Sequence, residues 1–137
     1  MNVQKALKLM KKNGYKITKR RKDILSYFKH VDGYRTAKDV IAYMRQRHEG
    51  ISFDTIYRNL HLYNDLGILE STELQAEKHF RMACTTDHHH HFICNDCGAT
   101  TKINICPMDD VKLNLANYYI AGHKFEVYGL CPVCRIA

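Results

Sequence analysis

Residues 52–63 read Ser52-Phe-Asp-Thr-Ile-Tyr-Arg-Asn-Leu-His-Leu-Tyr63, and a glycine follows at position 67. Serine is a favoured N-cap and glycine is common just beyond a helix end, so the stretch predicts a helix. With about 100° of rotation per residue, the helix has an apolar side that would pack inward. This side carries Phe53, Ile56, Leu60 and Tyr63, and the opposite side carries Asp54, Tyr57, Arg58, His61 and Asp65. A merely solvated face more often pairs Lys with Glu four residues apart, so this face is predicted to bind a partner.

Three more helices are predicted upstream of this stretch. The first follows apolar spacing over residues 3–10 and ends near Gly14. The second begins after Thr18, which is a suitable N-cap. Thr36 and Asp39 have the spacing of a capping box at the start of the third helix.

A β-hairpin is predicted downstream of residue 67. Residues 68–82 are β-prone, with a polar turn expected over Gln75-Ala-Glu-Lys78. Helices followed by one hairpin are typical of a winged helix-turn-helix. The predicted fold class is therefore α+β, with a winged-helix DNA-binding domain over residues 1–82 and a small α/β domain over residues 83–137.

The charge of the 137-residue chain is unevenly distributed between these two parts. Residues 1–82 carry 17 Lys and Arg against 9 Asp and Glu, whereas residues 83–137 carry 4 against 5. A basic surface often serves only solubility, but a basic winged helix suits a polyanion such as duplex DNA. Side chains expected to contact phosphates are Lys11, Lys16, Arg20 and Arg21. Side chains expected to reach the bases are Thr55, Tyr57, Arg58 and His61.

The cysteines all lie in the second part of the chain. No apolar run approaches the ~20 residues of a membrane helix, and no secretory signal opens the sequence. A cytoplasmic location is expected, where thiols stay reduced. Six cysteines in such a chain therefore indicate metal binding before disulfides.

Two CxxC pairs, Cys94-x-x-Cys97 and Cys131-x-x-Cys134, are separated by 33 residues. Four thiolates in two such pairs suit tetrahedral zinc, so a closed structural zinc site is predicted. The alternative is a pair of redox CxxC motifs, but the sequence lacks the βαβ pattern of a thioredoxin. Between the pairs, a helix is predicted from Pro107 and a strand over residues 124–128.

A run of four histidines, His88 to His91, precedes the first CxxC pair. In an extended chain, His88 and His90 would face one way and the other two the opposite way, so two half-sites are expected. Further ligands are available for each half-site; the candidates are Glu70, Glu73, His79, Cys84 and Asp87 on one side and Asp109 and His123 on the other. Such Cys, His and carboxylate sets suit zinc better than magnesium or calcium. Cys106 has no obvious partner and is expected to be a buried free thiol.

Taken together, the chain resembles the ferric uptake regulator (Fur) family, dimeric metal-dependent repressors of bacterial metal-uptake genes. The residues that carry the resemblance are Ser52-Phe-Asp-Thr-Ile-Tyr57-Arg58-Asn-Leu60, Leu66-Gly67-Ile68, the four histidines, both CxxC pairs and Gly98. Within the family the chain is most similar to the zinc uptake regulators of Gram-positive bacteria.

The resemblance implies roles for particular residues. The helix over 52–66 would be the recognition helix, and residues 83–137 would form the dimerisation domain. Structural zinc would be held by Cys94, Cys97, Cys131 and Cys134. A sensing site at the hinge would use Glu70, Cys84, His89 and His91, with Glu73 competing for the place of Glu70. An additional site would use His88, His90, Asp109 and His123.

The resemblance also implies cofactors, partners and a choice of metal. Each subunit would hold one structural zinc ion and one or two regulatory ones, and a homodimer would bind double-stranded operator DNA, with no membrane and no small-molecule substrate. Iron- and peroxide-sensing relatives often have an acidic residue where this chain has Lys102, and a thiolate from Cys84 favours zinc.

Two alternative functions remain, one within the same family and one outside it. An iron-, manganese- or peroxide-sensing repressor would belong to the same family, and a zinc-ribbon interaction module would need neither DNA nor Arg58. A zinc hydrolase needs an open coordination position beside a general base. No HExxH-like helix is present to supply these groups, so an enzyme is not expected.

Overall fold

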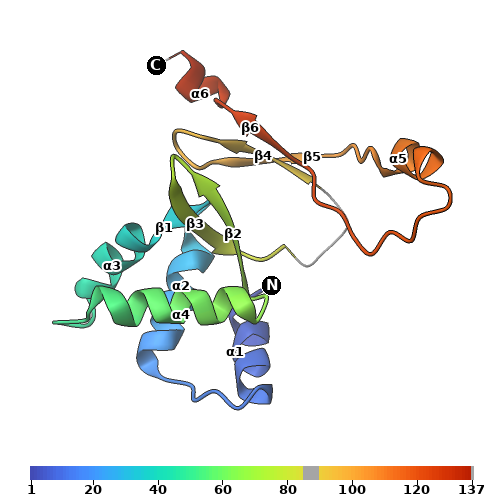
Figure 1. Ribbon diagram of the computed structural model, residues 1–137. Helices are drawn as coiled ribbons and strands as arrows, with labels where there is room; N and C mark the ends of the chain where they lie inside the picture. The colour runs from blue at the N-terminus through green and yellow to red at the C-terminus, as the bar shows by residue number, and fades with distance from the viewer. Residues whose placement is uncertain (85–89, 137) are drawn as a thin grey trace. The chain divides into compact units, whose positions relative to one another are not determined.

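The computed structural model describes residues 1–84 and 90–136. The chain forms two compact units, Met1–Thr86 and Asp87–Ala137, which are described separately below (Figure 1). Both contain helices and strands, and this confirms the predicted α+β class with a helical N-terminal part and a small sheet in the C-terminal part. None of the helices in the described ranges has the length and apolar character that crossing a bilayer requires.

Four helices make up most of the first unit: α1 (Val3–Lys12), α2 (Lys19–His30), α3 (Ala37–Arg45) and α4 (Phe53–Asp65). The predicted N-caps are confirmed, because the side chains of Thr18, Thr36 and Ser52 each accept a hydrogen bond from a backbone N–H of the first turn. Thr36 and Asp39 bond reciprocally as a capping box.

A three-stranded antiparallel sheet forms the wing of the first unit. Its strands are β1 (Arg35–Thr36), β2 (Leu69–Leu74) and β3 (Glu77–Met82), in the order β1-β3-β2. The turn is shorter than predicted, because only Gln75 and Ala76 form it, with φ of 52° and 59°. Two successive left-handed residues are typical of the two-residue hairpin turn that matches strand twist. Glu77 and Lys78, expected in the turn, belong to β3.

The core of the first unit is built from the apolar sides of the helices and of the wing. Tyr63 and Phe80 are its largest fully buried side chains, and Ile56 and Leu60 on α4 are also fully buried, as predicted. The prediction for Phe53 is wrong, because its side chain is 45% exposed. Phe53 is the first residue of α4, where the helix extends beyond the core, and its ring stacks on that of Tyr57 with 5.7 Å between centroids.

The second unit is a small three-stranded sheet with two short helices. In chain order its elements are β4 (His90–Cys94), β5 (Thr100–Ile103), α5 (Met108–Asn114), β6 (Glu126–Gly129) and α6 (Pro132–Arg135). The central strand β4 pairs antiparallel with β5 and parallel with β6. Because β4 carries His90, His91 and Cys94, the first cysteine of a CxxC pair, the sheet places side chains that could bind metal along its middle.

Candidate metal centres and nucleic-acid interface

The four cysteines of the two CxxC pairs converge in the second unit. Their sulfur atoms all lie within 4.8 Å of one another. Cys94 ends β4, and Gly98, at a φ of 75°, closes the turn that brings Cys97 back beside it. Cys131 is the N-cap of α6 and Cys134 lies within this helix.

The distances within this cysteine cluster suit zinc. Sγ of Cys97 lies 3.8 Å from Sγ of Cys131. A tetrahedral ion with Zn–S bonds of about 2.3 Å places neighbouring sulfurs about 3.8 Å apart. The donor set therefore fits a closed four-thiolate zinc site, in which the metal would crosslink the end of β4 to α6.

Ionisation of the same cluster is uneven. Burial opposes ionisation of Cys94, but backbone hydrogen bonds from Cys97, Cys131 and Asp96 outweigh it and lower its pKa to about 6. Hydrogen bonding with the Cys131 sulfur raises the pKa of the Cys134 thiol above its ordinary value. Four thiolates this close together repel one another, so full deprotonation calls for a divalent cation among them.

A second cluster in the same unit joins His90 on β4, Cys106 before α5 and His123 before β6. Nε2 of His90 lies 3.3 Å from both Sγ of Cys106 and Nε2 of His123, and that sulfur lies 3.6 Å from Nε2 of His123. The expectation of a buried Cys106 without a partner is wrong. The loop that enters α5 brings this half-buried thiol against two imidazoles.

The other two residues predicted for this site are placed differently. Asp109 lines a cavity of about 460 Å³ together with Cys106 and His123, but it is not part of the three-residue cluster. His88 lies outside the described residues. Sequence reasoning missed the proximity of Cys106 to His90 and His123, because that contact joins residues 16 and 17 positions apart in the chain.

The residues predicted for the sensing site belong to both units. Oε1 of Glu70 accepts a hydrogen bond of 2.6 Å from the backbone N–H of Cys84, and it lies 3.5 Å from Nη2 of Arg81. Glu73 lies three residues along β2, paired in register with Lys78 and exposed. An odd separation puts it on the opposite face of the strand from Glu70.

His91 lies on β4 in the second unit, and His89 lies outside the described residues. The structure therefore brings together Glu70 and Cys84 and leaves the complete sensing set as a prediction.

The outer surface of α4 carries an aromatic stripe. Phe53, Tyr57 and His61 follow one another at intervals of four residues, and the Tyr57 and His61 rings lie 4.5 Å apart edge to face. Phe53 extends this stripe to the N-terminal end of the helix. Sequence reasoning had assigned Phe53 to the core, and the missed signal was its position directly after the N-cap.

A second, mainly polar surface on α4 includes a residue of α2. Thr55, Arg58, Asn59, Leu62 and Arg21 line one shallow pocket. Arg21 donates through Nε to Oδ1 of Asn59 at 3.1 Å and through Nη1 to the carbonyl of Lys16 at 2.6 Å, so it fixes α2 against α4. Arg58 is 75% exposed, and its Nε lies 3.1 Å from Oδ2 of Asp54.

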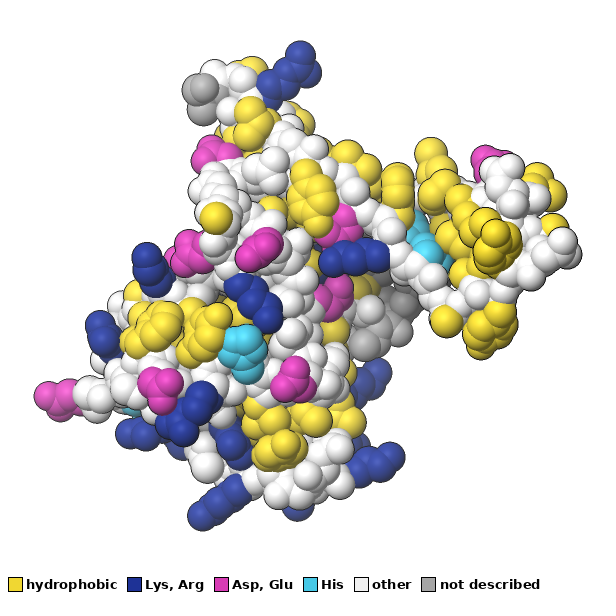
Figure 2. Space-filling view, in the orientation of Figure 1, with side chains coloured by type: hydrophobic (Ala, Val, Ile, Leu, Met, Phe, Trp, Pro, Cys, Tyr) yellow, Lys and Arg dark blue, Asp and Glu magenta, His cyan; other side chains and the backbone are white. Residues whose placement is uncertain are grey.

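The predicted phosphate-binding side chains Lys11, Lys16 and Arg20 are all exposed. Figure 2 shows Lys and Arg side chains distributed over the helices of the first unit.

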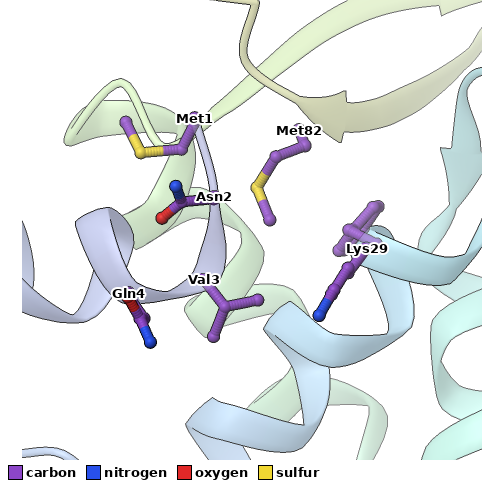
Figure 3. Close-up of a pocket in the computed structure, with 7 residues that line it drawn as sticks. Met1, Asn2, Val3, Gln4, Lys29 and Met82 are labelled. Carbon is purple, nitrogen blue, oxygen red and sulfur yellow. The ribbon is translucent and has the colours of Figure 1, made fainter.

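A further hollow of about 420 Å³ opens beside the start of α1 in the first unit (Figure 3). Met1, Asn2, Val3 and Gln4 line one side, and Phe28, Lys29 and Met82 complete it. Its lining includes no Cys, His, Asp or Glu, so it is not a candidate metal centre.

Comparisons with known proteins agree with this arrangement. The model of the ferric uptake regulator family matches residues 12–128. Two relatives described as "Ferric uptake regulation protein", from Staphylococcus aureus strain Mu50 and Staphylococcus epidermidis strain ATCC 12228, are each 53% identical over 135 residues. Each alignment covers 98% of this chain, with 99% of the first relative and 97% of the second.

Solved structures show the same fold. The Helicobacter pylori ferric uptake regulator aligns with a TM-score of 0.77 at 19% identity, over 98% of this chain and 95% of that one. A zinc uptake regulator in complex with zinc and DNA aligns with a TM-score of 0.68 at 21% identity, over 98% and 93%.

A winged helix joined to a small sheet with cysteine clusters defines a class of metal-dependent DNA-binding regulators. The chain belongs to the ferric uptake regulator family. Members of this family are transcription regulators and not enzymes, and they bind metal ions and DNA.

Proposed function

We propose that this protein is a zinc-responsive repressor that binds the operators of zinc-uptake genes as a cytoplasmic homodimer. The observation that carries the choice of zinc is the placement of Cys84 beside Glu70, where the backbone N–H of Cys84 donates to the Glu70 carboxylate at 2.6 Å. A set that combines the Cys84 thiolate, the Glu70 carboxylate and the imidazoles of His89 and His91 would bind zinc in preference to magnesium, calcium or manganese.

Glu70 is a better candidate ligand than Glu73. Glu70 is paired in register with Arg81, which lies three residues before Cys84 in the chain. Glu73 lies nearer the turn of the wing and faces the other side of β2. A regulatory set of Glu70, Cys84, His89 and His91 would draw ligands from both units. A metal held this way would fix their relative orientation, and in a two-fold dimer this sets the spacing of the two recognition helices.

DNA recognition is assigned to α4. Arg58 presents an exposed guanidinium suited to a guanine edge, and Tyr57 and His61 present an aromatic stripe suited to base edges and thymine methyls. Thr55 lies beside Arg58, and Arg21 holds α2 in place. Lys11, Lys16 and Arg20 would add phosphate contacts and make affinity strongly dependent on salt.

Dimerisation is assigned to the second unit. Large apolar side chains are exposed there, among them Leu113, Tyr118, Tyr119 and Val133. Tyr119 is 93% exposed. Large apolar side chains exposed in this number on a small unit support an interface with another chain.

Iron sensing is the second candidate function. It is favoured by the relatives at 53% identity, which are described as ferric uptake regulation proteins. Both candidates share the fold, the DNA surface and the structural cysteines, so they differ only in the metal that closes the sensing site.

Fluorescence anisotropy on DNA from a zinc-importer promoter and from an iron-uptake promoter tests the choice of metal. Free zinc, iron(II) and manganese would each be buffered and titrated. We expect zinc alone to induce binding, and we expect Cys84→Ser and Glu70→Gln to abolish the response while Glu73→Gln preserves it. Binding that follows iron(II), or a Cys84→Ser protein that still responds to zinc, would overturn the proposal.

A further inference from the structure

Three metal-ligating side chains from distant parts of the second unit meet at one point. His90 comes from the central strand β4, Cys106 from the loop before α5, and His123 from the loop before β6. His90 is only 7% exposed, and its ring makes an edge-to-face contact with that of Phe125, with centroids 5.3 Å apart. The imidazole is thus held in place by the sheet, while the other two ligands approach from the loops.

The distances among the three donor atoms match the edges of a tetrahedron around zinc. With Zn–N of about 2.05 Å and Zn–S of about 2.3 Å, a tetrahedral site has N···N edges of about 3.3 Å and N···S edges of about 3.6 Å. Here the two Nε2 atoms are 3.3 Å apart, and the sulfur lies 3.3 and 3.6 Å from them. The cluster has the dimensions of a zinc site with three ligands in place.

We propose that Cys106 is a thiolate ligand, with His90 and His123, of a zinc site distinct from the four-cysteine cluster. Two imidazoles and a thiolate form a borderline-soft donor set, which selects zinc over manganese, magnesium and calcium. The proposal goes beyond the additional site that the family resemblance implies, because it adds Cys106 as a ligand. It is independent of which metal closes the sensing site.

A fourth donor can come from the cavity beside the cluster. Asp109 lines this cavity together with Cys106 and His123. One carboxylate and one thiolate would balance the charge of Zn²⁺ between two neutral imidazoles. Lys112 also lines the cavity and offers a counter-charge to Asp109 when no metal is bound.

This site would position the α5 segment. Helix α5 buries none of its residues, so apolar packing holds it only weakly. Its N-cap residue, Pro107, makes no side-chain hydrogen bond to the first turn either. Ligands at both ends of the segment, Cys106 before α5 and His123 after it, would tie it to β4. Figure 2 shows apolar side chains gathered over the α5 end of this unit, so the same tie would order an exposed apolar surface.

Cobalt(II) substitution of the full-length protein tests the proposal. The four-cysteine site is kept filled with zinc, verified as one zinc per chain by metal analysis, and Cys84→Ser removes the other candidate thiolate. Cobalt(II) is then titrated into Cys84→Ser, Cys84→Ser/Cys106→Ser and Cys84→Ser/His79→Gln proteins. The last is a matched control, because His79 lies on the wing in the first unit.

We expect the Cys84→Ser protein and the His79→Gln control to show a near-ultraviolet sulfur-to-cobalt charge-transfer band with tetrahedral visible bands, both bleached by one equivalent of zinc. The charge-transfer band is expected to be lost with Cys106→Ser, while circular dichroism shows an unchanged fold. A band that persists without Cys106, or that is absent when Cys106 is the one thiolate available, would overturn the proposal. Neither readout uses DNA, so failure of zinc-dependent repression would leave this result standing.

Discussion

The two units of this protein differ in what stabilises each of them internally. The first unit, Met1–Thr86, has a continuous apolar core in which Tyr63, Phe80, Ile56 and Leu60 are fully buried. In the described residues of the second unit, the buried side chains are only His90, Ile93 and Cys94. Two of these three, His90 and Cys94, belong to clusters that could hold a metal ion, so we expect metal coordination to take the place of apolar packing in this unit.

Size explains the difference. A unit of about 50 residues cannot bury enough apolar surface to offset its conformational entropy, and units this small commonly depend on metals or on oligomerisation. The second unit has both routes available, through its cysteine cluster and its exposed apolar side chains. The first unit folds around a core of ordinary composition and has no such need.

The largest effect is expected from breaking the cysteine cluster. Structural zinc contributes about 10–16 kcal/mol in zinc-finger peptides. Cys131→Ser should therefore unfold the second unit and leave α2 and α4 of the first unit folded. Hydrogen exchange measured by mass spectrometry reports both units in one experiment.

We expect β4 and β5 to lose protection in the Cys131→Ser protein. Cys84→Ser is the matched control, because this cysteine lies in the first unit and outside the cluster. Equal loss of protection in both units would contradict independent stabilisation.

A core truncation in the first unit should give the opposite pattern. Phe80 is fully buried on β3 and packs against the helices. Phe80→Ala should lower the free energy of unfolding by about 3–5 kcal/mol, because it removes buried apolar area and leaves a cavity. Urea unfolding followed by helical circular dichroism would measure this loss.

The cysteine cluster should be unaffected by Phe80→Ala, and its zinc content after dialysis checks this. Phe53→Ala is the control for aromatic truncation, since this ring is exposed and its loss should cost less than about 1 kcal/mol. A Phe80→Ala protein that lost its zinc would show that the second unit depends on the first.

A smaller effect, on DNA affinity alone, is expected at Arg58. Both side chains of its ion pair with Asp54 are exposed, so the Arg58 guanidinium can exchange Asp54 for a DNA base at little cost in free energy. Arg58→Ala should weaken operator binding by about 1–3 kcal/mol without changing the stability of either unit.

Asp54→Asn should tighten binding, since it removes a carboxylate that repels phosphate. Anisotropy at two salt concentrations separates a lost base contact from a lost phosphate contact.

Prediction from sequence succeeded where the signal was local. Thr18, Thr36 and Ser52 cap their helices because capping depends on residues within one turn. The convergence of the two CxxC pairs was also predicted, although they lie far apart in the chain, because two such pairs supply the four thiolates of a tetrahedral zinc site. The third wing strand β1 was not predicted, because two residues carry no periodic pattern and pair only through β3.

The failures share a physical cause, which is contact between residues far apart in the chain. Cys106 meets His90 and His123 across 16 and 17 residues through the return of two loops. Neither periodicity nor spacing encodes that meeting. Phe53 failed for a related reason, because helical phase gives the direction of a side chain but not where the core ends.

The smallest expected effect concerns a polar contact inside the apolar unit. Nε2 of His48 lies 2.7 Å from Oδ2 of Asp23, and Nζ of Lys19 lies 3.3 Å from Oδ1. Burial opposes ionisation of Asp23, but hydrogen bonds from His48 and Lys19 outweigh it and lower the pKa of this carboxyl. A lowered pKa in the folded state stabilises the fold above the unfolded value of about 3.9, and the contribution is lost as the pH falls through the folded pKa.

Asp23→Asn should therefore cost about 1–2 kcal/mol at neutral pH. The difference from the unsubstituted protein should shrink as the pH falls below the unfolded value of about 3.9 and through the lowered pKa of the folded carboxyl, where this group also becomes neutral. Urea unfolding of the helices between about pH 7 and about pH 3 would measure this difference, with exposed Asp32→Asn as the control. A difference that stayed constant over that whole range would mean that Asp23 contributes by shape and not by charge. In that case the charge of Asp23 would add nothing to the stability of the first unit, and the contrast with a second unit that we expect to depend on metal would be sharper.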